Sequence, residues 1–305
     1  MPEKPVVAGS AYRGAWAGPR ALWLSLREAR PQVQVIFLLR FATAAALALL
    51  SGVPPRPAIA VGAAAWFLLT WAVYLVNGIA DVVEDRANGA RRPIARGDLS
   101  PAAATRIAWG LAVAGLTVAA AVSPLLVLLG AGQLLLGWAY SMGPAPLKRV
   151  TVHAVVAVVL AGLLTYAAGA LCAGGRPEEH LLLFPAMMAL WMAVGGVTKD
   201  LSDVRGDRLA GRRTLPILLG ERRARRVMAL VAGTVAGGFV VLAADSPPTV
   251  RLASWLVLLG AVVLAWVVCA PASRGDVFRR RWPYRIFMAT QYIAHISVLL
   301  KFASA

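Results

Sequence analysis

Hydrophobic residues along the chain fall into long, nearly unbroken runs, separated by short segments rich in arginine, proline and glycine. A helix needs about 20 apolar residues to cross a hydrocarbon core of ~30 Å, and nine runs come close to that length. The predicted spans are residues 33–51, 57–80, 104–121, 124–141, 152–171, 181–199, 227–244, 252–270 and 284–301. This pattern predicts an all-α integral membrane protein with nine transmembrane helices.

The composition supports the membrane interpretation. Of the 305 residues, 59% are hydrophobic and only 15% are charged. A soluble domain would be about half apolar and about a quarter charged. The difference excludes an ordinary soluble protein.

The positions of the 31 Lys and Arg residues predict the orientation of the spans. They lie in the N-terminal segment and in or beside the loops after the second, fourth, sixth and eighth spans, except for Arg40, Arg56, Arg176, Arg251 and Lys301. By the positive-inside rule these basic segments are cytoplasmic. We therefore expect a multi-pass protein of the cell membrane, with a cytoplasmic N-terminus and its C-terminus on the opposite side. The net charge of +17 then reflects topology and attraction to anionic membrane lipids rather than a nucleic-acid partner.

The spans divide the chain into three parts. Residues 1–32 form an N-terminal cytoplasmic segment, residues 33–301 a single transmembrane domain, and residues 302–305 a short tail. The first 30 residues lack the apolar core of a cleavable signal peptide. Within them, residues 18–30 (GPRALWLSLREAR) are either an amphipathic helix on the membrane surface or a solvated leader.

Five of the 14 acidic residues form two groups with helical spacing. Asn77, Asp81 and Asp85 follow the second span at i, i+4 and i+8, and on one α-helix they would share a face. A second group at the end of the sixth span recurs at i, i+3 and i+7 and consists of Asp200, Asp203 and Asp207. Both groups end even-numbered spans, so both are expected at the cytoplasmic boundary.

Two facing groups of carboxylates need cations between them, because like charges crowded together repel. Carboxylate and amide oxygens suit Mg²⁺, which prefers a few carboxylates together with substrate phosphates. The two groups therefore predict a site for two or three Mg²⁺ ions that hold a phosphate-rich anion. The alternative is that they are helix-end charges, solvated by headgroup water and paired with nearby arginines.

Several cations stand near the acids and could neutralise a bound diphosphate. We predict this role for Arg92, Lys148 and Lys199. Arg40 lies inside the first span, where an arginine needs a partner or an aqueous cavity. It either joins the diphosphate site or extends its guanidinium to the cytoplasmic interface.

These motifs together resemble the UbiA superfamily of intramembrane prenyltransferases. The first family motif, N-x-x-x-D-x-x-x-D, matches Asn77, Asp81 and Asp85, and "RRPIARGDLS" follows it. The second, D-x-x-x-D, matches Asp203 and Asp207 and is extended upstream by Asp200. The segments "YSMGPAPLKR" and "GDRLAGRRTLPILLG" also resemble the family. With nine predicted helices, the resemblance covers essentially the whole chain.

The resemblance implies nine helices around a central lipid-accessible cavity, with the acidic motifs opposed under a cytoplasmic cap. Isoprenoid diphosphates are the donors of this family and Mg²⁺ is its cofactor. Ionisation of the donor would give an allyl cation, which would then be attacked by a small lipophilic acceptor, expected to be aromatic. Tyr140 and Ser141, which match the family's loop after the fourth span, are the predicted catalytic neighbours.

One position departs from the family pattern. Many relatives have Asp directly after the motif asparagine, whereas this chain has Gly78. The departure removes a possible outer ligand or hydrogen-bond partner. The segment "KDLSDVRGDR" resembles the branches that prenylate homogentisate and chlorophyllide-like acceptors.

Three hypotheses are consistent with these residues. The leading one is a Mg²⁺-dependent prenyltransferase, and the second is a UbiA-type membrane terpene cyclase that uses the same metal motifs without an acceptor. The third is an ion-coupled transporter, which would usually place its acids nearer the middle of the membrane.

Overall fold

The computed structural model describes residues 18–175 and 177–303. Within this part of the chain the secondary structure is helical, apart from one isolated bridge between Val150 and Arg213. Nine of the described helices or helical segments are long and apolar enough to cross a membrane. Their main helices are α2 (Pro31–Leu49), α3 (Pro57–Ala80), α6 (Pro101–Ala120), α7 (Pro124–Ser141), α8 (Thr151–Ala173), α9 (Leu183–Leu209), α11 (Glu221–Leu242), α12 (Pro248–Cys269) and α14 (Trp282–Ala303). The all-α membrane fold with nine spans is thus confirmed.

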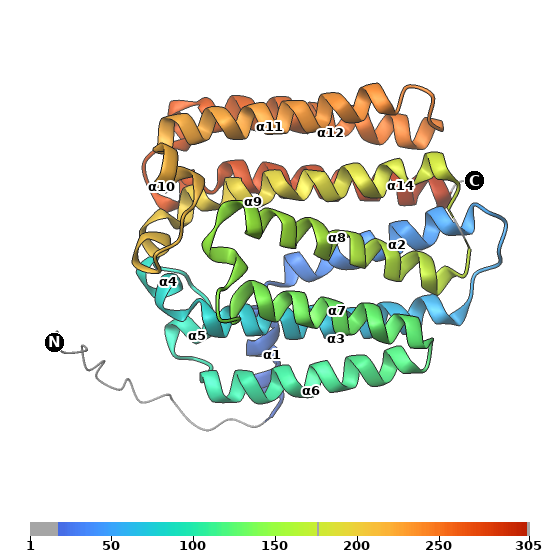
Figure 1. Ribbon diagram of the computed structural model, residues 1–305, viewed down its shortest axis with the longest axis horizontal. Helices are drawn as coiled ribbons and strands as arrows, with labels where there is room; N and C mark the ends of the chain where they lie inside the picture. The colour runs from blue at the N-terminus through green and yellow to red at the C-terminus, as the bar shows by residue number, and fades with distance from the viewer. Residues whose placement is uncertain (1–17, 176, 304–305) are drawn as a thin grey trace.

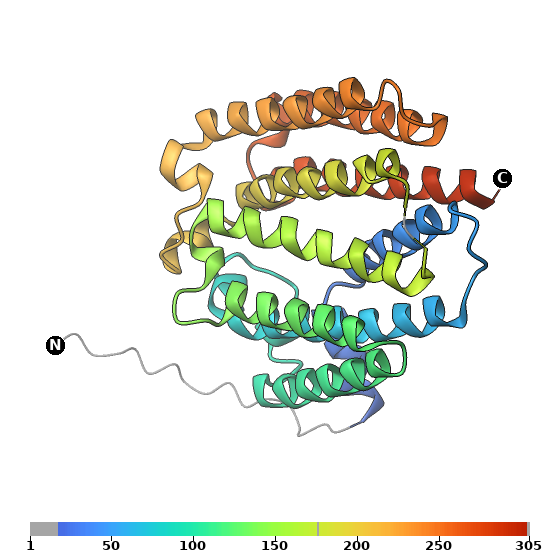
Figure 2. The same ribbon diagram turned by 45° about the vertical axis from the view of Figure 1, so that its right-hand side comes forward.

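The long helices lie side by side, roughly along one direction (Figures 1 and 2). The pair α11 and α12 forms one side and α6 the other, with α9, α14, α2, α8, α3 and α7 between them. Shorter helices gather at one end of the bundle: α4 (Val82–Ala87), α5 (Pro93–Arg96) and α10 (Leu215–Leu219). α14 ends at the opposite end of the bundle (Figure 1).

Local sequence signals explain where several spans begin. Proline occupies the first helical position of five of them, where its missing N–H costs no hydrogen bond and its φ suits the helix. Before α6 and α7, the hydroxyls of Ser100 and Ser123 each accept a hydrogen bond from a backbone N–H of the first turn. The expected starts therefore agree with the structure within a few residues, except for α11, which begins at Glu221 rather than 227.

Close helix contacts depend on small residues. A Cβ atom at Gly169 of α8 would overlap the backbone carbonyl of Phe41 in α2. Because that contact is with backbone, no side-chain movement relieves it, and only glycine allows α2 and α8 to cross at this distance.

The first motif is interrupted rather than continuous. α3 ends at Ala80, Asp81 has φ −95° and ψ 8°, and α4 begins a new short helix at Val82. The second motif shows the reverse: α9 runs on to Leu209, ten residues beyond the predicted end of the sixth span. One acidic motif is therefore bent, and the other lies on an uninterrupted helix.

Part of the N-terminal segment is a helix, α1 (Pro19–Glu28). Ala21, Leu24 and Glu28 are buried on the side that packs against α3, α5 and α6, whereas Leu22 and Trp23 are exposed. Residues 19–28 thus form a helix with one buried and one exposed side, and its position on the membrane surface stays a prediction. The remainder of the predicted segment, residues 1–17, and tail residues 304–305 lie outside the described residues.

Candidate active site

A cavity lies between α2, α3, α7, α8, α9 and α14, with an empty volume of about 1340 Å³ that includes its opening. Its polar residues are concentrated where α3 and α9 meet the short helices and loops, and they include Asn77, Asp81, Lys148, Lys199, Asp200 and Arg212. Farther into the bundle the wall is mostly apolar, formed by residues such as Ile36, Phe37 and Met288. The cavity thus offers a charged end and a mostly hydrophobic remainder, in which Arg40 and Gln291 are polar exceptions.

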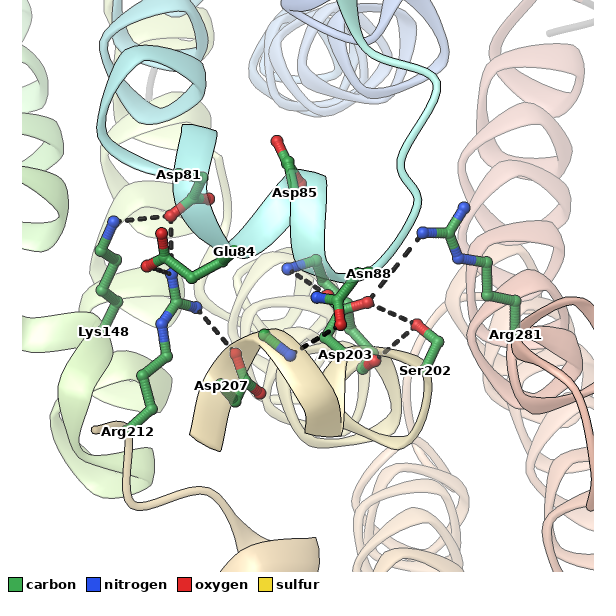
Figure 3. Close-up of polar contacts among 12 residues, drawn as sticks. Asp81, Glu84, Asp85, Asn88, Lys148, Ser202, Asp203, Asp207, Arg212 and Arg281 are labelled. Carbon is green, nitrogen blue, oxygen red and sulfur yellow. Dashed lines mark hydrogen bonds and ion pairs between the residues drawn. The ribbon is translucent and has the colours of Figure 1, made fainter. Parts of the chain in front are cut away.

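The buried carboxylate of Asp81 forms ion pairs with two basic side chains (Figure 3). Lys148 Nζ and Arg212 Nη2 each lie 2.6 Å from Asp81 Oδ1. Burial by itself would raise the pKa of Asp81, but Lys148 and Arg212 outweigh it and hold the pKa below its ordinary value. The carboxylate is therefore ionised at neutral pH.

Arg212 joins the two acidic motifs. Its guanidinium lies 3.0 Å from Glu84 Oε1 on α4 and 3.4 Å from Asp207 Oδ1 on α9, in addition to its contact with Asp81. The two motifs face each other across this single arginine.

Backbone pairing explains why both cations reach Asp81. Lys148 lies in the 3₁₀ turn Leu147–Arg149 between α7 and α8, and Arg212 lies in the loop after α9. The N–H of Arg213 donates to the carbonyl of Arg149 at 2.7 Å, and the isolated bridge at Val150 extends this contact. The two loops are thereby held together beside the first motif.

The second motif carries its own cation. Lys199 Nζ lies 2.9 Å from Asp203 Oδ2, one helical turn away, and the hydroxyl of Ser202 donates to Asp203 Oδ1 at 2.7 Å. Asp200 lines the cavity, and no hydrogen bond or ion pair holds its carboxylate within the described part of the chain. Asp207 Oδ2 is buried without a hydrogen-bond partner. Asp200 and Asp207 therefore retain oxygens able to accept a further ligand.

Asp85 does not join this cluster. Its carboxylate is 2.7 Å from Arg92 Nη1, and the same guanidinium binds Glu28 of α1 through Nε at 2.7 Å. Neither Asp85 nor Arg92 lines the cavity. The prediction that Asn77, Asp81 and Asp85 share one helical face is wrong, because the helix is interrupted at Asp81 and α4 turns Asp85 toward α1 and α5.

Four residues around the site were absent from the predicted set: Glu28, Arg30, Glu84 and Arg212. Arg30 lines the charged end of the cavity from the start of α2, in a left-handed conformation with φ 59°. Arg212 stands in a run of basic residues that is hard to distinguish from topological charge. Glu84 is adjacent to Asp85 in the motif, and its position three residues after Asp81 was an available signal for helical proximity.

The predicted catalytic neighbours lie at the end of α7, and their catalytic role stays a prediction. Tyr140 and Ser141 both line the cavity, and Asn77 Nδ2 donates to Ser141 Oγ at 3.3 Å. Arg40 also lines the cavity but lies apart from the acids. It is ten residues from Arg30 along α2, about 15 Å of helix, and its side chain bonds to Gln291.

The donor set suits Mg²⁺ only in combination with a ligand. Among the described residues, no three acidic, histidine or cysteine side chains lie close enough to form a ready-made metal cage. The open oxygens of Asp200 and Asp207 and the amide of Asn77 nonetheless face or adjoin the charged end. Mg²⁺ commonly uses one or two carboxylates and takes its remaining ligands from water and substrate phosphates. The residues thus fit ions that are shared with a bound diphosphate.

The fold and the site together define the class of this protein. It is an integral membrane enzyme with two acidic motifs at one end of a largely hydrophobic cavity. The model of the UbiA prenyltransferase family matches residues 38–289, and the chain belongs to this family. The digeranylgeranylglyceryl phosphate synthase of Natronomonas pharaonis is 31% identical over 225 residues, which cover 73% of this chain and 76% of that protein. The protoheme IX farnesyltransferase of Geobacter sulfurreducens is 31% identical over 189 residues, covering 62% and 68%.

Solved structures show the same fold. A UbiA homologue from Archaeoglobus fulgidus, bound to GPP and Mg²⁺, has a TM-score of 0.67 to this chain at 18% identity, with 90% of this chain and 99% of that chain covered. The structure of a UbiA homologue from Aeropyrum pernix has a TM-score of 0.66 at 23% identity, covering 87% and 97%. The fold is therefore that of UbiA homologues along nearly all of the chain.

Proposed function

We propose that this protein transfers a prenyl group from an isoprenoid diphosphate to a lipophilic acceptor, with Mg²⁺ as cofactor. The observation that carries the proposal is the pairing of two acidic motifs and three buried or half-buried cations with the apolar interior of one cavity. A diphosphate head matches the charged end and an isoprenoid tail matches the remainder.

The chain's own cations support the proposed binding of the diphosphate head group. Lys148, Lys199 and Arg212 present positive charge on the cavity wall, with Arg30 beside them. Charge that develops on the departing diphosphate is stabilised by such fixed cations in a site with little water. Two or three Mg²⁺ ions, held through Asn77, Asp81 and the α9 aspartates, would supply further charge that stabilises the leaving group.

Residues next to the charged end are suited to interact with the prenyl group once the diphosphate has left. Loss of diphosphate leaves an allyl cation at the first carbon of the donor. Tyr74 and Tyr140 line the cavity near Asn77, and aromatic faces attract a cation. Ser141 is held by Asn77 and lies where it can orient either substrate.

The acceptor is proposed as lipophilic, and its class is wider than the aromatic compounds that the sequence suggested. The names of two relatives point to a glyceryl phosphate and to protoheme. We further propose that the end carrying α4 and α10 faces the cytoplasm, because the basic loops gather there.

The proposal is tested with purified protein in lipid nanodiscs, supplied with Mg²⁺ and C10, C15 or C20 allylic diphosphates, and with a panel of acceptors. Mass spectrometry should detect prenylated adducts that disappear in Asp81→Asn and Asp203→Asn. The matched control is Asp98→Asn, because Asp98 is exposed and, among the residues that the structure describes, forms an ion pair only with Arg96 at 3.1 Å. Cyclic products formed without acceptor would identify a terpene cyclase instead, and unchanged turnover in both motif variants would refute the proposal.

A further inference from the structure

A buried polar group far from the acidic motifs remains unexplained by prenyl transfer. Arg40 is 2% exposed and Gln291 is fully buried, and both line the cavity. The guanidinium of Arg40 donates to the side-chain oxygen of Gln291. It also lies over the ring of Phe37, with 5.0 Å between the guanidinium carbon and the ring centroid.

All the partners that the described residues offer to this guanidinium are neutral. The hydroxyl of Tyr166 lies beside it, and no carboxylate forms an ion pair with it in residues 18–175 or 177–303. Tyr166 is itself hydrogen-bonded to His295 at 2.7 Å. A buried arginine without a counter-charge is costly, and in a membrane such a group usually marks a functional pathway or binding site.

Two hydrogen-bond donors in this group are unused. Arg40 Nε and Gln291 Nε2 are buried and have no acceptor. Both side chains belong to the cavity wall, on facing helices α2 and α14. The site therefore has two unpartnered hydrogen-bond donors and one positive charge. The group that would complete it is a negatively charged hydrogen-bond acceptor.

The donor substrate does not supply that element. Its diphosphate would be held at the charged end, about 15 Å away along α2, and its tail is a hydrocarbon. An apolar tail against Arg40 would leave the charge and both donors unpaired. The missing anion must therefore come from a different molecule in the same cavity.

We infer that Arg40 and Gln291 bind the oxyanion, a carboxylate or phosphate, of the lipophilic second substrate. This inference rests on the proposed function, because it assigns the acceptor to the inner part of the donor's cavity. Phe37 and Tyr74 pack edge to face, 5.8 Å apart, and both line the cavity that also holds Asn77. A compact acceptor anchored on Arg40 would present its opposite end toward the reacting carbon. The bound oxyanion also neutralises a positive charge that would oppose formation of an allyl cation nearby.

The test measures binding rather than turnover, with protein in zwitterionic nanodiscs and empty nanodiscs as background. The probes are 1-hydroxy-2-naphthoate and its neutral carboxamide, and dodecyl phosphate and its neutral dimethyl ester, titrated by microscale thermophoresis. At least one anionic probe should bind about tenfold or more tightly than its neutral counterpart, as expected for a charge-assisted bond. The preferred pair distinguishes carboxylate from phosphate, and equal affinity within both pairs would overturn the inference.

Two variants locate the effect. Arg40→Gln should abolish the preference for the anion. Gln291→Glu places a carboxylate beside the guanidinium of Arg40 and neutralises its buried charge. This variant should therefore also abolish the preference for the anion, and the test does not depend on the folding of a single variant. Arg225→Gln is the control, because Arg225 is equally buried but is held by Glu221 and Ser273 outside the cavity. A preference that survives in Gln291→Glu and Arg40→Gln would contradict the inference.

Binding of geranyl S-thiolodiphosphate with Mg²⁺ separates this inference from the proposed function. The affinity of the protein for this donor analogue should change less than about threefold in Arg40→Gln, because loss of a whole charge-assisted contact would lower the affinity about tenfold. A loss of affinity for the donor analogue as large as the loss of affinity for the anionic probe would assign Arg40 to binding of the diphosphate instead. Failure of wild-type protein to bind the donor would refute the proposed function while leaving the anion preference measurable.

Discussion

The side-chain carboxylate of Glu28 lies where a side chain at position 78 would have to be. A Cβ atom built on Gly78 would overlap Glu28 Oε1 and lie 2.7 Å from Arg92 Nη2. Glu28 also accepts the backbone N–H of Ile94 at 2.8 Å. The space beside Gly78, the residue directly after the motif asparagine, is thus occupied by a carboxylate that comes from α1.

Gly78→Asp should therefore destabilise the protein. The new side chain collides with Glu28 and adds a like charge, and overpacking alone costs about 1–3 kcal/mol. A lower melting temperature in detergent would show this, and Gly78→Asp/Glu28→Gly should recover much of the loss. Gly132→Ala is the control, because a Cβ at Gly132 meets no atom within 4 Å. A single variant as stable as wild type would contradict the steric argument.

Arg212→Gln should reduce kcat/KM by about a hundredfold or more, the range found when one preorganised donor to a developing anion is removed. The variant also leaves Asp81, Glu84 and Asp207 without their shared cation. Arg213→Gln is the adjacent control, because its side chain is exposed and its structural contact is made by the backbone. Steady-state kinetics of the two variants decide the matter. Similar losses in both would indicate a general effect of basic charge instead.

The ionisation of Asp81 should stabilise the fold at all pH values above its ordinary pKa. Its folded-state pKa is lowered, so the contribution is fully present above about pH 4 and is lost as the pH falls through the folded pKa. The difference in melting temperature between wild type and Asp81→Asn should stay constant from pH 8 to pH 5 and change only in stronger acid. A difference that varies near neutrality would show that Lys148 and Arg212 do not hold this carboxylate ionised.

Glu28 should show the opposite dependence. Burial raises its pKa, and the attraction of Arg92 offsets this only in part. The associated stability is present below about pH 4.5 and is lost as the pH rises through the folded pKa. Relative to Glu28→Gln, wild type should lose stability from acid toward neutral pH. The same thermal measurements over pH 4 to 8 test both residues, and equal slopes would contradict the assignment.

Asp200→Asn should separate stability from activity. No hydrogen bond or ion pair within the described chain holds this carboxylate, so removing its charge should not lower the melting temperature. If Asp200 shares a Mg²⁺ ion with the diphosphate, the variant should need a higher Mg²⁺ concentration for half-maximal rate. Asp203→Asn provides the contrast, because it also breaks the ion pair with Lys199. An unchanged Mg²⁺ dependence in Asp200→Asn would remove this residue from the metal site.

The amino-acid sequence by itself determined the membrane class, the number of spans and the fact that charge collects at one end of the spans. These properties follow from runs of apolar residues and from the distribution of basic residues, which are local along the chain. Even the entry points of α3 and α7 were readable, because a proline begins each of them. The motif acids were also readable, since their spacing and position at span ends are sequence properties.

Only the tertiary structure decided which charge each acid meets. The break at Asp81 turns Asp85 away from the cavity, and Glu28 reaches Arg92 from a helix more than 60 residues earlier in the chain. Arg212 resembles the arginines next to it in sequence, but a backbone contact between two loops places Arg212, and not those neighbours, against Asp81. Such pairings join residues far apart in the chain, and ionic attraction depends on distance in space rather than on spacing in sequence.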